Sequence, residues 1–354
     1  MRYVAVLLLS CLSIAAAGES ALRTSPLMRG TLWWLSDAAH GSWTRAQFEQ
    51  AIGEQRAVGF DILWLLNTPS LFRLATAPDA KTDPLALIYE IADANAMRVI
   101  ADLPKGGWYG KTTAEAMASE MRAYAEAFSA RYGAHASFHG WYINHEINPI
   151  APDDKEQTTF WRTAWKEAAS ACHRVAPKSV VTVSPFFMMD SLSRRGFRYQ
   201  TPEEYASWWG ESLKETGIDI LMLQDSGAEH LSFFTVADRE PFFAAMRKAC
   251  DEAGAQFWVN VETGEAHVAN WEEFIALERE NKVPWRFTPI DWLEQKLQLA
   301  ARYGDGIINW GYFPFMDPAG GTAKPEVLAA YEAYRTYVNR VKASAAVSSD
   351  RETK

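Results

Sequence analysis

The sequence predicts a single-domain α/β protein with the (β/α)8, or TIM-barrel, fold. Short apolar runs alternate with longer helical patterns, which is typical of βα units and a parallel sheet. An open doubly wound sheet normally carries a G-x-G-x-x-G loop after its first strand, and none follows here. The predicted strands are the following eight runs: Thr31 to Leu35, Asp61 to Leu66, Arg98 to Asp102, Gly140 to Glu146, Val180 to Ser184, Ile218 to Gln224, Gln256 to Glu262 and Gly306 to Trp310.

The segments between these runs have recognisable helix starts. Three starts combine a capping side chain with a proline: Asp83-Pro84, Thr201-Pro202 and Thr288-Pro289. The strand-to-helix loops are long and rich in aromatic residues and proline, as at 67–82, 185–200 and 263–287. Because these loops build the active site of a (β/α)8 barrel, we expect the functional site at that end.

The bulk composition favours one large core and limits the partners. The chain has 354 residues, of which 48% are hydrophobic and 22% charged, so one domain is sufficient to bury its apolar residues. The formal net charge is -9 and no run of Lys or Arg occurs, which argues against nucleic acid as a partner. We expect a substrate that is neutral or bound locally, and the sequence does not predict an oligomeric state.

The N-terminus has the layout of a cleavable secretory signal. Arg2 precedes an apolar run that ends in small residues at Ala15 and Ala17, so we expect residues 1–17 to be removed. The run is too short to span a bilayer. Lipidation at Cys11 is the less favoured alternative, because apolar sequence continues beyond it. The prediction is a periplasmic or secreted protein with the barrel at 18–342 and a disordered tail at 343–354.

The two remaining cysteines are predicted to be free. Cys172 and Cys250 fall in segments that read as different helices, after the fourth and sixth strands. An intervening helix should separate them by more than the distance a disulfide allows.

Two predicted strands end in the same pattern, an Asn followed two residues later by a Glu. Asn144 and Glu146 end the fourth strand, and Asn260 and Glu262 end the seventh. Side chains alternate along a strand, so each pair shares one face. A carboxylate at the end of a buried strand is costly without partners, and two of them indicate a site.

Paired carboxylates are the groups that glycoside hydrolysis requires. One protonates the leaving oxygen, and the other attacks the anomeric carbon or activates water. We therefore predict Glu146 and Glu262 as the catalytic pair, with the alternative that either merely caps a helix or pairs with an Arg. Asp225 is the best substitute for Glu262, although Asp before Ser-Gly is commonly a turn residue.

Aromatic and polar side chains near the strand ends are candidates for sugar binding. The chain has 15 Trp, most of which should fill the core, but some should stack on sugar rings at the working face. The predicted substrate-binding residues are Trp34, Trp64, Asn67, Asp102, Trp108, Tyr142, Asn144, Gln224, Asp225, Asn260, Trp310 and Tyr312.

Metal and serine-hydrolase chemistry are poorly supported by the residue pattern. No early strand carries His-x-His, and no G-x-S-x-G elbow occurs. We expect no metal and no cofactor, and we expect His145 to point away from the face of Glu146.

The motifs resemble a bacterial family of unknown function whose members are predicted to be glycoside-hydrolase-like TIM barrels. The resemblance is carried by the G-W-Y-x-x-x-E motif at 140–146 and the L-Q-D motif at 223–225, and it runs from about Thr31 to Tyr337. It implies a barrel with a sugar-directed site. A Glu ending strand four and a Glu ending strand seven is also similar to the retaining barrel glycosidases. Here His145 stands where that clan has Asn before the acid, and Ser226 follows Asp225 where the family usually has Gly.

These observations predict a glycosidase that acts on an oligo- or polysaccharide by a two-carboxylate mechanism. The alternative is a catalytically idle carbohydrate-binding barrel of an envelope polysaccharide system. A third interpretation is a non-glycosidic hydrolase or lyase that uses Asp225 or His145.

Overall fold

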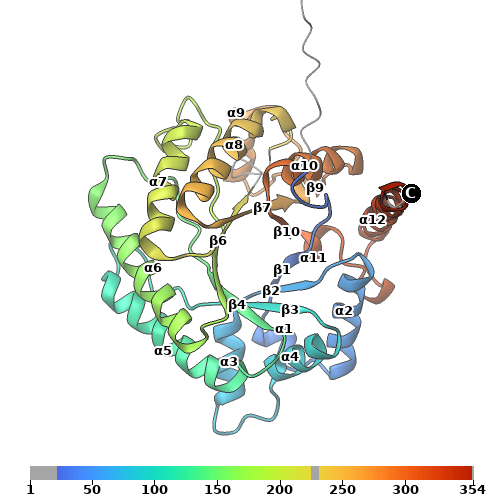
Figure 1. Ribbon diagram of the computed structural model, residues 1–354. Coiled ribbons are helices and arrows are strands. Elements are labelled where there is room, and N and C mark those ends of the chain that lie inside the picture. The colour runs from blue at the N-terminus through green and yellow to red at the C-terminus, as the bar shows by residue number, and fades with distance from the viewer. Residues whose placement is uncertain (1–21, 225–230, 353–354) are drawn as a thin grey trace, which may run out of the picture.

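Eight parallel strands form a closed barrel surrounded by helices (Figure 1). The computed structural model describes residues 22–224 and 231–352. The neighbour order around the barrel is β1-β10-β7-β6-β5-β4-β3-β2, so the predicted (β/α)8 fold is confirmed. The barrel strands are β1 (Gly30–Trp34), β2 (Ile62–Leu66), β3 (Arg98–Asp102), β4 (Phe138–Ile143), β5 (Val180–Val183), β6 (Ile220–Gln224), β7 (Gln256–Glu262) and β10 (Gly306–Trp310).

The barrel closes between its first and last strands. Thr31 of β1 pairs in parallel with Asn309 of β10, and the Thr31 hydroxyl donates to Asn309 Oδ1 at 3.0 Å. The Asn309 amide in turn donates to the Val261 carbonyl of β7 at 2.7 Å. The Thr31 and Asn309 side chains are fully buried, so these hydrogen bonds satisfy polar groups whose burial without a partner would be costly, at the point where the barrel closes.

Helices follow the strands and cover the outside of the barrel (Figure 1). Asp83 and Thr201 accept from backbone N–H groups at the starts of two of them, and the third predicted proline start also precedes a helix. The helices are α1 (Asp37–His40), α2 (Arg45–Ala57), α3 (Thr68–Thr76), α4 (Pro84–Ala94), α5 (Ala114–Tyr132), α6 (Lys155–Val175), α7 (Pro202–Thr216), α8 (Val236–Ala253), α9 (Trp271–Arg279), α10 (Ile290–Tyr303), α11 (Tyr312–Phe315), the 3-10 turn η1 (Ala319–Gly321) and α12 (Pro325–Glu352).

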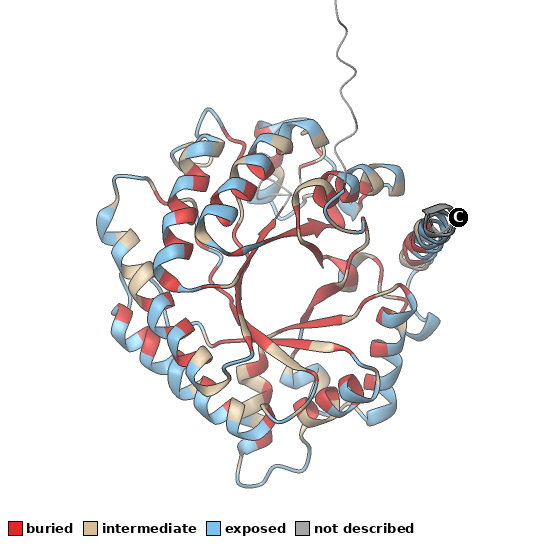
Figure 2. Ribbon diagram, in the orientation of Figure 1, coloured by how far each residue is buried: buried red, intermediate tan, exposed pale blue. Residues whose placement is uncertain are grey.

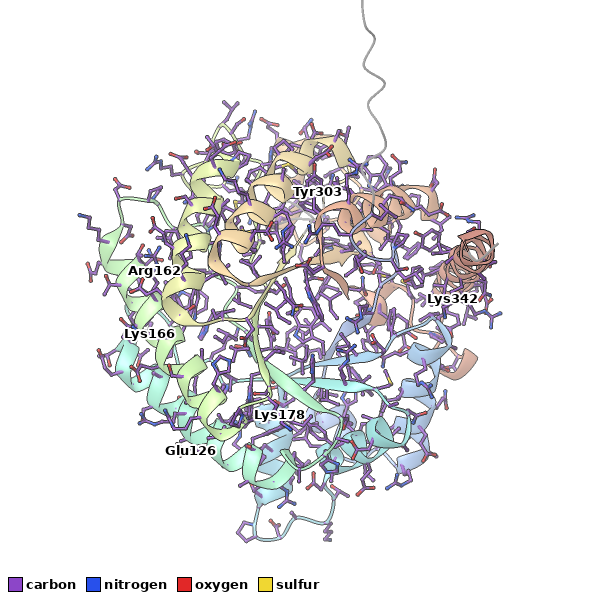
Figure 3. The ribbon with its side chains drawn as sticks, in the orientation of Figure 1. Glu126, Arg162, Lys166, Lys178, Tyr303 and Lys342 are labelled. Carbon is purple, nitrogen blue, oxygen red and sulfur yellow. The ribbon has the colours of Figure 1, made fainter. Side chains whose placement is uncertain are left out.

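Alternation along the strands divides the apolar residues into two cores. Ile62 and Trp64 of β2 point into the barrel, whereas Leu63 and Leu65 pack against the helices. Figure 2 shows the strands buried and the outer sides of the helices exposed. Side chains fill the centre of the ring in Figure 3, so the barrel interior is a packed core rather than a pore. Polar side chains that face inward must therefore lie at the strand ends to reach a ligand.

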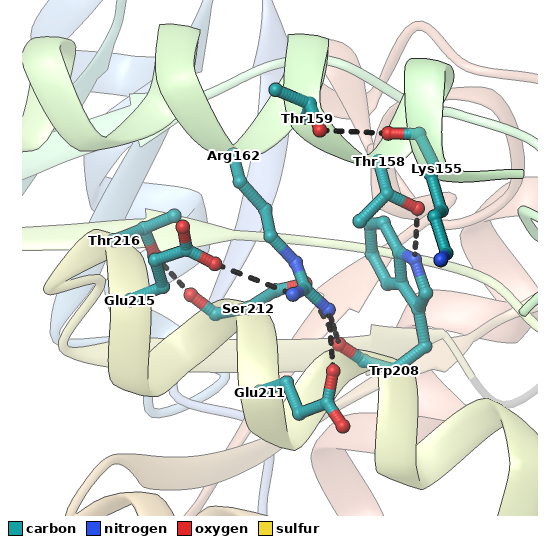
Figure 4. Close-up of polar contacts among 9 residues, drawn as sticks. All are labelled: Lys155, Thr158, Thr159, Arg162, Trp208, Glu211, Ser212, Glu215 and Thr216. Carbon is teal, nitrogen blue, oxygen red and sulfur yellow. Dashed lines mark hydrogen bonds and ion pairs between the residues drawn. The ribbon is translucent and has the colours of Figure 1, made fainter.

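A partly buried arginine joins α6 to α7 (Figure 4). Arg162 donates to the Ser212 hydroxyl at 2.9 Å and to the Trp208 carbonyl at 3.2 Å, and it also pairs with Glu211 and Glu215. Its guanidinium lies over the Trp208 ring. These contacts fix one helix pair on the outside of the barrel.

The segment after β7 carries structure that the sequence did not predict. Residues 263–287, expected as a loop, contain β8 (Gly264–Ala266), α9 and β9 (Trp285–Phe287), and β8 and β9 pair antiparallel. Short strands of three residues have no periodicity to detect.

The end of the chain also differs from the prediction. Residues 343–352 continue α12, where we expected disorder. Alanine at 343, 345 and 346 has high helix propensity, and an expectation based only on the polar composition of this segment does not include that propensity.

Two smaller predictions can also be compared with the structure. Cys172 and Cys250 are buried and not bonded to each other, as predicted.

Within the described ranges, no helix is long and apolar enough to span a membrane. The predicted signal peptide at 1–17 lies outside the described residues.

Candidate active site

A cavity of about 640 Å³ lies at the carboxyl ends of the barrel strands. It brings together one of the two predicted catalytic residues and most of the predicted binding residues. These are Trp34, Trp64, Asn67, Asp102, Tyr142, Asn144, Glu146, Gln224, Asn260 and Trp310. Residues from β1, β2, β3, β4, β6, β7 and β10 or the segments after them thus meet in one place, as the barrel geometry requires.

Three predicted site residues do not line this cavity. Glu262 is only 1% exposed and is not among the lining residues. Trp108 packs on Trp161, with ring centroids 5.1 Å apart, outside the cavity. Tyr312 is fully buried in the outer core against Phe60, so the prediction that it contacts a sugar is wrong.

A glycine turn explains the position of Tyr312. Gly311 adopts φ +107°, which turns the chain at the end of β10 and directs Tyr312 beneath β1 rather than toward the cavity. Asp225 lies outside the described residues.

Glu146 is held by a hydrogen-bonded chain that joins the ends of four neighbouring strands, β4 to β7. The strand β4 ends at Ile143, three residues earlier than expected, and Glu146 follows it into the cavity. Gln224 of β6 donates from Nε2 to Glu146 Oε1 and to the Ser184 carbonyl, both at 3.1 Å. Asn260 of β7 donates to the Ser184 hydroxyl at 3.1 Å. The carboxylate is therefore oriented by groups that are themselves fixed.

Glu262 is positioned by its backbone as well as by its strand. The buried ammonium of Lys296 on α10 donates to the Glu262 carbonyl at 2.6 Å. In the sheet register Glu262 pairs with Trp310, which lines the cavity. Glu262 therefore lies at the level of the cavity, on the same inward face as Asn260.

Asp102 organises the wall formed by β2 and β3. Its Oδ2 accepts from the Asn67 backbone N–H at 3.0 Å and from Asn144 Nδ2 at 2.7 Å. Its Oδ1 accepts from the backbone N–H and the hydroxyl of Thr68. Burial raises the pKa of Asp102 to about 6, and the four donors limit that rise.

Tyr142 connects the three carboxyl groups electrostatically. Its ring packs edge-on against Trp64, with centroids 4.9 Å apart. Burial raises the pKa of Tyr142 well above its usual value, and Glu146, Asp102 and Glu262 each raise it further. The phenol is therefore a neutral O–H donor that lies within Coulombic range of both predicted catalytic carboxyl groups.

His145 is a structural residue. Its Nε2 bonds to the Lys105 carbonyl at 2.8 Å, and its Nδ1 accepts from Trp165 Nε1 at 3.4 Å. Burial lowers the pKa of His145 to about 4, so the ring is neutral and both nitrogens are engaged. It points away from the cavity, as predicted, and anchors the loop that follows β3.

Several residues of the site were not predicted from the sequence. Ser184 does not line the cavity but bonds to Gln224 and Asn260, which do, and it directly follows β5, where the strand-end rule could have found it. Phe186 follows in the next loop. Arg73, Lys105 and Glu120 come from α3, a loop and α5, and no pattern marks them.

Metal-binding side chains do not cluster in the described part of the chain. There, no group of three or more His, Cys, Asp or Glu could hold an ion.

The closed barrel defines a protein of the (β/α)8 class with carboxylates at its strand ends. Residues 28–322 match the family described as Domain of unknown function (DUF4434), and the chain belongs to that family. The family resemblance predicted from the motifs is thereby confirmed. No protein of established annotation matches the chain.

Solved structures of carbohydrate-active proteins share the fold. One, from Bacteroides thetaiotaomicron VPI-5482 and described provisionally as an alpha-L-fucosidase, has a TM-score of 0.65 at 19% identity, covering 96% of this chain and 99% of that chain. The catalytic domain of the major endoglucanase from Xanthomonas campestris pv. campestris has a TM-score of 0.53 at 12% identity, covering 88% and 95%. At such identities the similarity establishes the fold alone.

Proposed function

We propose that this protein is an O-glycosyl hydrolase that acts on an oligo- or polysaccharide. Glu146 acts as the general acid, and Glu262 acts as the nucleophile or as the base that activates water. The observation that carries the proposal is the placement of Glu146 in a cavity that is also lined by two asparagines, Asn144 and Asn260, each with an unused acceptor among the described residues.

The asparagines offer hydrogen-bond acceptors suited to sugar hydroxyls. The amide nitrogens of Asn144 and Asn260 donate to Asp102 and Ser184, which leaves each Oδ1 free of a hydrogen-bond partner among the described residues. An acceptor left in this state is costly, and a ligand hydroxyl would satisfy it. Both asparagines line the cavity that contains Glu146.

Aromatic faces complete a binding surface for a sugar ring. Trp34 is 69% exposed although it lines the cavity, and Trp310 lines it as well. Aromatic side chains that line a cavity offer a ligand a large apolar contact area. The names of the two structural neighbours, one described provisionally as an alpha-L-fucosidase and one an endoglucanase, agree with a carbohydrate substrate.

The non-glycosidic alternative based on His145 is disfavoured. A general base needs a free nitrogen within reach of the substrate, and both ring nitrogens of His145 are engaged inside the protein. The alternative that uses Asp225 concerns a residue outside the described ranges.

Release of reducing ends from a panel of polysaccharides tests the proposal. The purified protein should cleave at least one polymer, and Glu146→Gln should abolish that cleavage while binding persists. If no polymer in a broad panel is cleaved or bound, the proposal fails.

A catalytically idle binding barrel is the second candidate. The burial of Glu262 favours it, because a nucleophile must reach the anomeric carbon and this side chain is 1% exposed. Binding of a polysaccharide without any release of reducing ends would support this candidate and exclude the hydrolase.

The proposed function also includes export of the protein from the cytoplasm. We infer that residues 1–17 direct the chain across the inner membrane and are removed, so that the mature protein begins at Gly18. N-terminal sequencing of protein recovered from the periplasm or medium tests this, and an uncleaved or cytosolic product would contradict it.

A further inference from the structure

Two cationic side chains that line the cavity have no partner among the described residues. Arg73 and Lys105 contribute to its wall, and among the described residues neither side chain makes an ion pair or hydrogen bond. Many other arginines of the chain are paired with acids, as Arg29 is with Asp61 and Arg247 with Asp305. The two free cations therefore stand out by their place in a ligand cavity.

Arg73 is directed to the cavity by the helix that carries it. Pro69 and Arg73 are four residues apart on α3, so they share one helix face, and both line the cavity. The start of α3 is anchored to the floor of the site, because Asp102 accepts from the Thr68 backbone and hydroxyl. The guanidinium thus projects from an element that the site itself holds in place.

Lys105 projects from a loop that is equally constrained. The His145 ring is hydrogen-bonded to the Lys105 carbonyl at 2.8 Å. His145 directly precedes the proposed acid, Glu146, in the sequence. Gly106 and Gly107 follow at φ +65° and +116°, where a Cβ would lie 3.0 Å from Met117 and 2.7 Å from Thr112. The backbone of Lys105 therefore has a fixed position at the cavity wall.

The surrounding charges do not neutralise this pair of cations. Glu120 lines the same cavity but forms no ion pair with either cation in the described part of the chain. Asp102 is occupied by four donors, and Glu146 is bound by Gln224. In a chain of net charge -9, two unpaired cations in the ligand cavity create a local site for an anion.

We propose that the glycan bound in this cavity is anionic and that Arg73 and Lys105 bind the carboxylate of a uronic acid unit. The proposal rests on the proposed function and names its substrate class. A planar guanidinium matches a carboxylate in two parallel hydrogen bonds, and the ammonium adds a point charge. The sequence-based expectation of a substrate that is neutral or bound locally is thereby narrowed to local binding of a charged sugar.

Binding to matched polymers tests the substrate class. Polygalacturonate, alginate, glucuronoxylan and hyaluronan are each compared with their carboxyl-reduced, neutral forms, with sulfated dextran as a second anion. We expect at least about tenfold tighter binding to one polyuronate than to its reduced form, and an affinity that falls with added salt.

Charge-removing variants assign the effect to the two side chains. Arg73→Gln and Lys105→Gln should each weaken polyuronate binding about tenfold or more and leave binding of the reduced polymer unchanged. Lys111→Gln, on the same loop, and Lys178→Gln are the matched controls and should change the binding of neither polymer. Lys178 precedes the N-terminal end of β5, whereas the cavity lies at the carboxyl ends of the strands.

The possible outcomes separate this proposal from the proposed function. Equal affinity for charged and reduced polymers, or polyuronate binding that both variants retain, overturns the anionic subsite while the glycosidase stands. Preference for sulfated dextran over every polyuronate overturns the assignment to a carboxylate. Failure to bind or cleave any polymer overturns both.

Discussion

The Gln224 side-chain amide lies 3.1 Å from Glu146 Oε1 and donates a hydrogen bond to it. The same nitrogen also donates to the Ser184 carbonyl, so one buried side chain fixes the orientation of the proposed acid against β5. Gln224 belongs to β6 and Glu146 follows β4, and the two residues are 78 positions apart in the chain. The parallel pairing of β4 with β5 and of β5 with β6 brings them together.

Removing this amide should lower turnover more than substrate affinity. We expect Gln224→Leu to reduce kcat about tenfold with little change in KM, because the carboxylate loses its orienting donor while the aromatic binding surface remains. Steady-state kinetics on a cleaved polymer would measure both. The conservative variant Gln224→Glu is a poor mimic, since it lacks the donor. An unchanged kcat in Gln224→Leu would show that the contact is structural.

Replacing either carboxylate by its amide should separate chemistry from binding. Glu146→Gln should lower kcat about 100- to 10,000-fold, since the amide keeps the shape but cannot transfer the proton. Glu262→Gln should cause a comparable loss, whereas Glu120→Gln, a carboxylate in the cavity outside the catalytic pair, should lower kcat less than tenfold. Full activity in Glu262→Gln would move the second role to Asp225.

Tyr142→Phe should weaken catalysis without loss of the fold. The phenol stays neutral across the working range, because burial and three carboxylates raise its pKa well above the usual value. It can therefore donate to a carboxylate or a ligand oxygen, and its loss should lower kcat/KM about tenfold. The ring that packs on Trp64 is retained in the variant. Kinetics combined with thermal unfolding distinguishes a lost donor from a damaged core.

Strand periodicity explains how much of the site could be predicted from the sequence. Alternation along the strands predicts an inward position for Asn144, Glu146, Asn260 and Glu262; the first three line the cavity, whereas Glu262 does not. Their meeting point follows from the fold class, because the carboxyl ends of barrel strands form one face.

Residues on irregular segments could not be predicted in this way. Tyr312 was expected at the cavity, but the turn at Gly311 redirects it, and no periodicity reports a single positive φ. Lys105 and Arg73 depend on a glycine turn and on the orientation of a short helix. Such placements are decided by tertiary packing, which a single sequence does not show.

The Arg162 junction provides a test of stability remote from the site. Arg162→Met should lower the free energy of unfolding by about 1 to 3 kcal/mol, because Ser212 and the Trp208 carbonyl lose a charged donor at a mostly buried position. Lys166 on the same helix is exposed, so Lys166→Met should change the free energy of unfolding by less than about 0.5 kcal/mol. Denaturant unfolding measures both, and equal values would contradict the role of the junction.

Asp102 should make the stability of the protein depend on pH in a predictable direction. Its pKa is raised to about 6 in the folded state from 3.8, so the folded protein holds this proton more tightly than the unfolded chain does. The associated stability is fully present below the unfolded pKa and is lost as the pH rises through about 6. Asn at this position cannot titrate, which makes Asp102→Asn the matched reference.

The difference in unfolding free energy between the native protein and Asp102→Asn should therefore change with pH. The unfolding free energy of the native protein, taken relative to that of Asp102→Asn, should fall by about 2 kcal/mol between pH 4 and pH 7. This value follows from the difference between the folded and unfolded pKa of Asp102 through linkage. Urea unfolding of both proteins across this range measures it. A difference that instead rises with pH would show that the four donors hold Asp102 ionised, in which case its carboxylate anchors Asn67, Thr68 and Asn144 at every working pH.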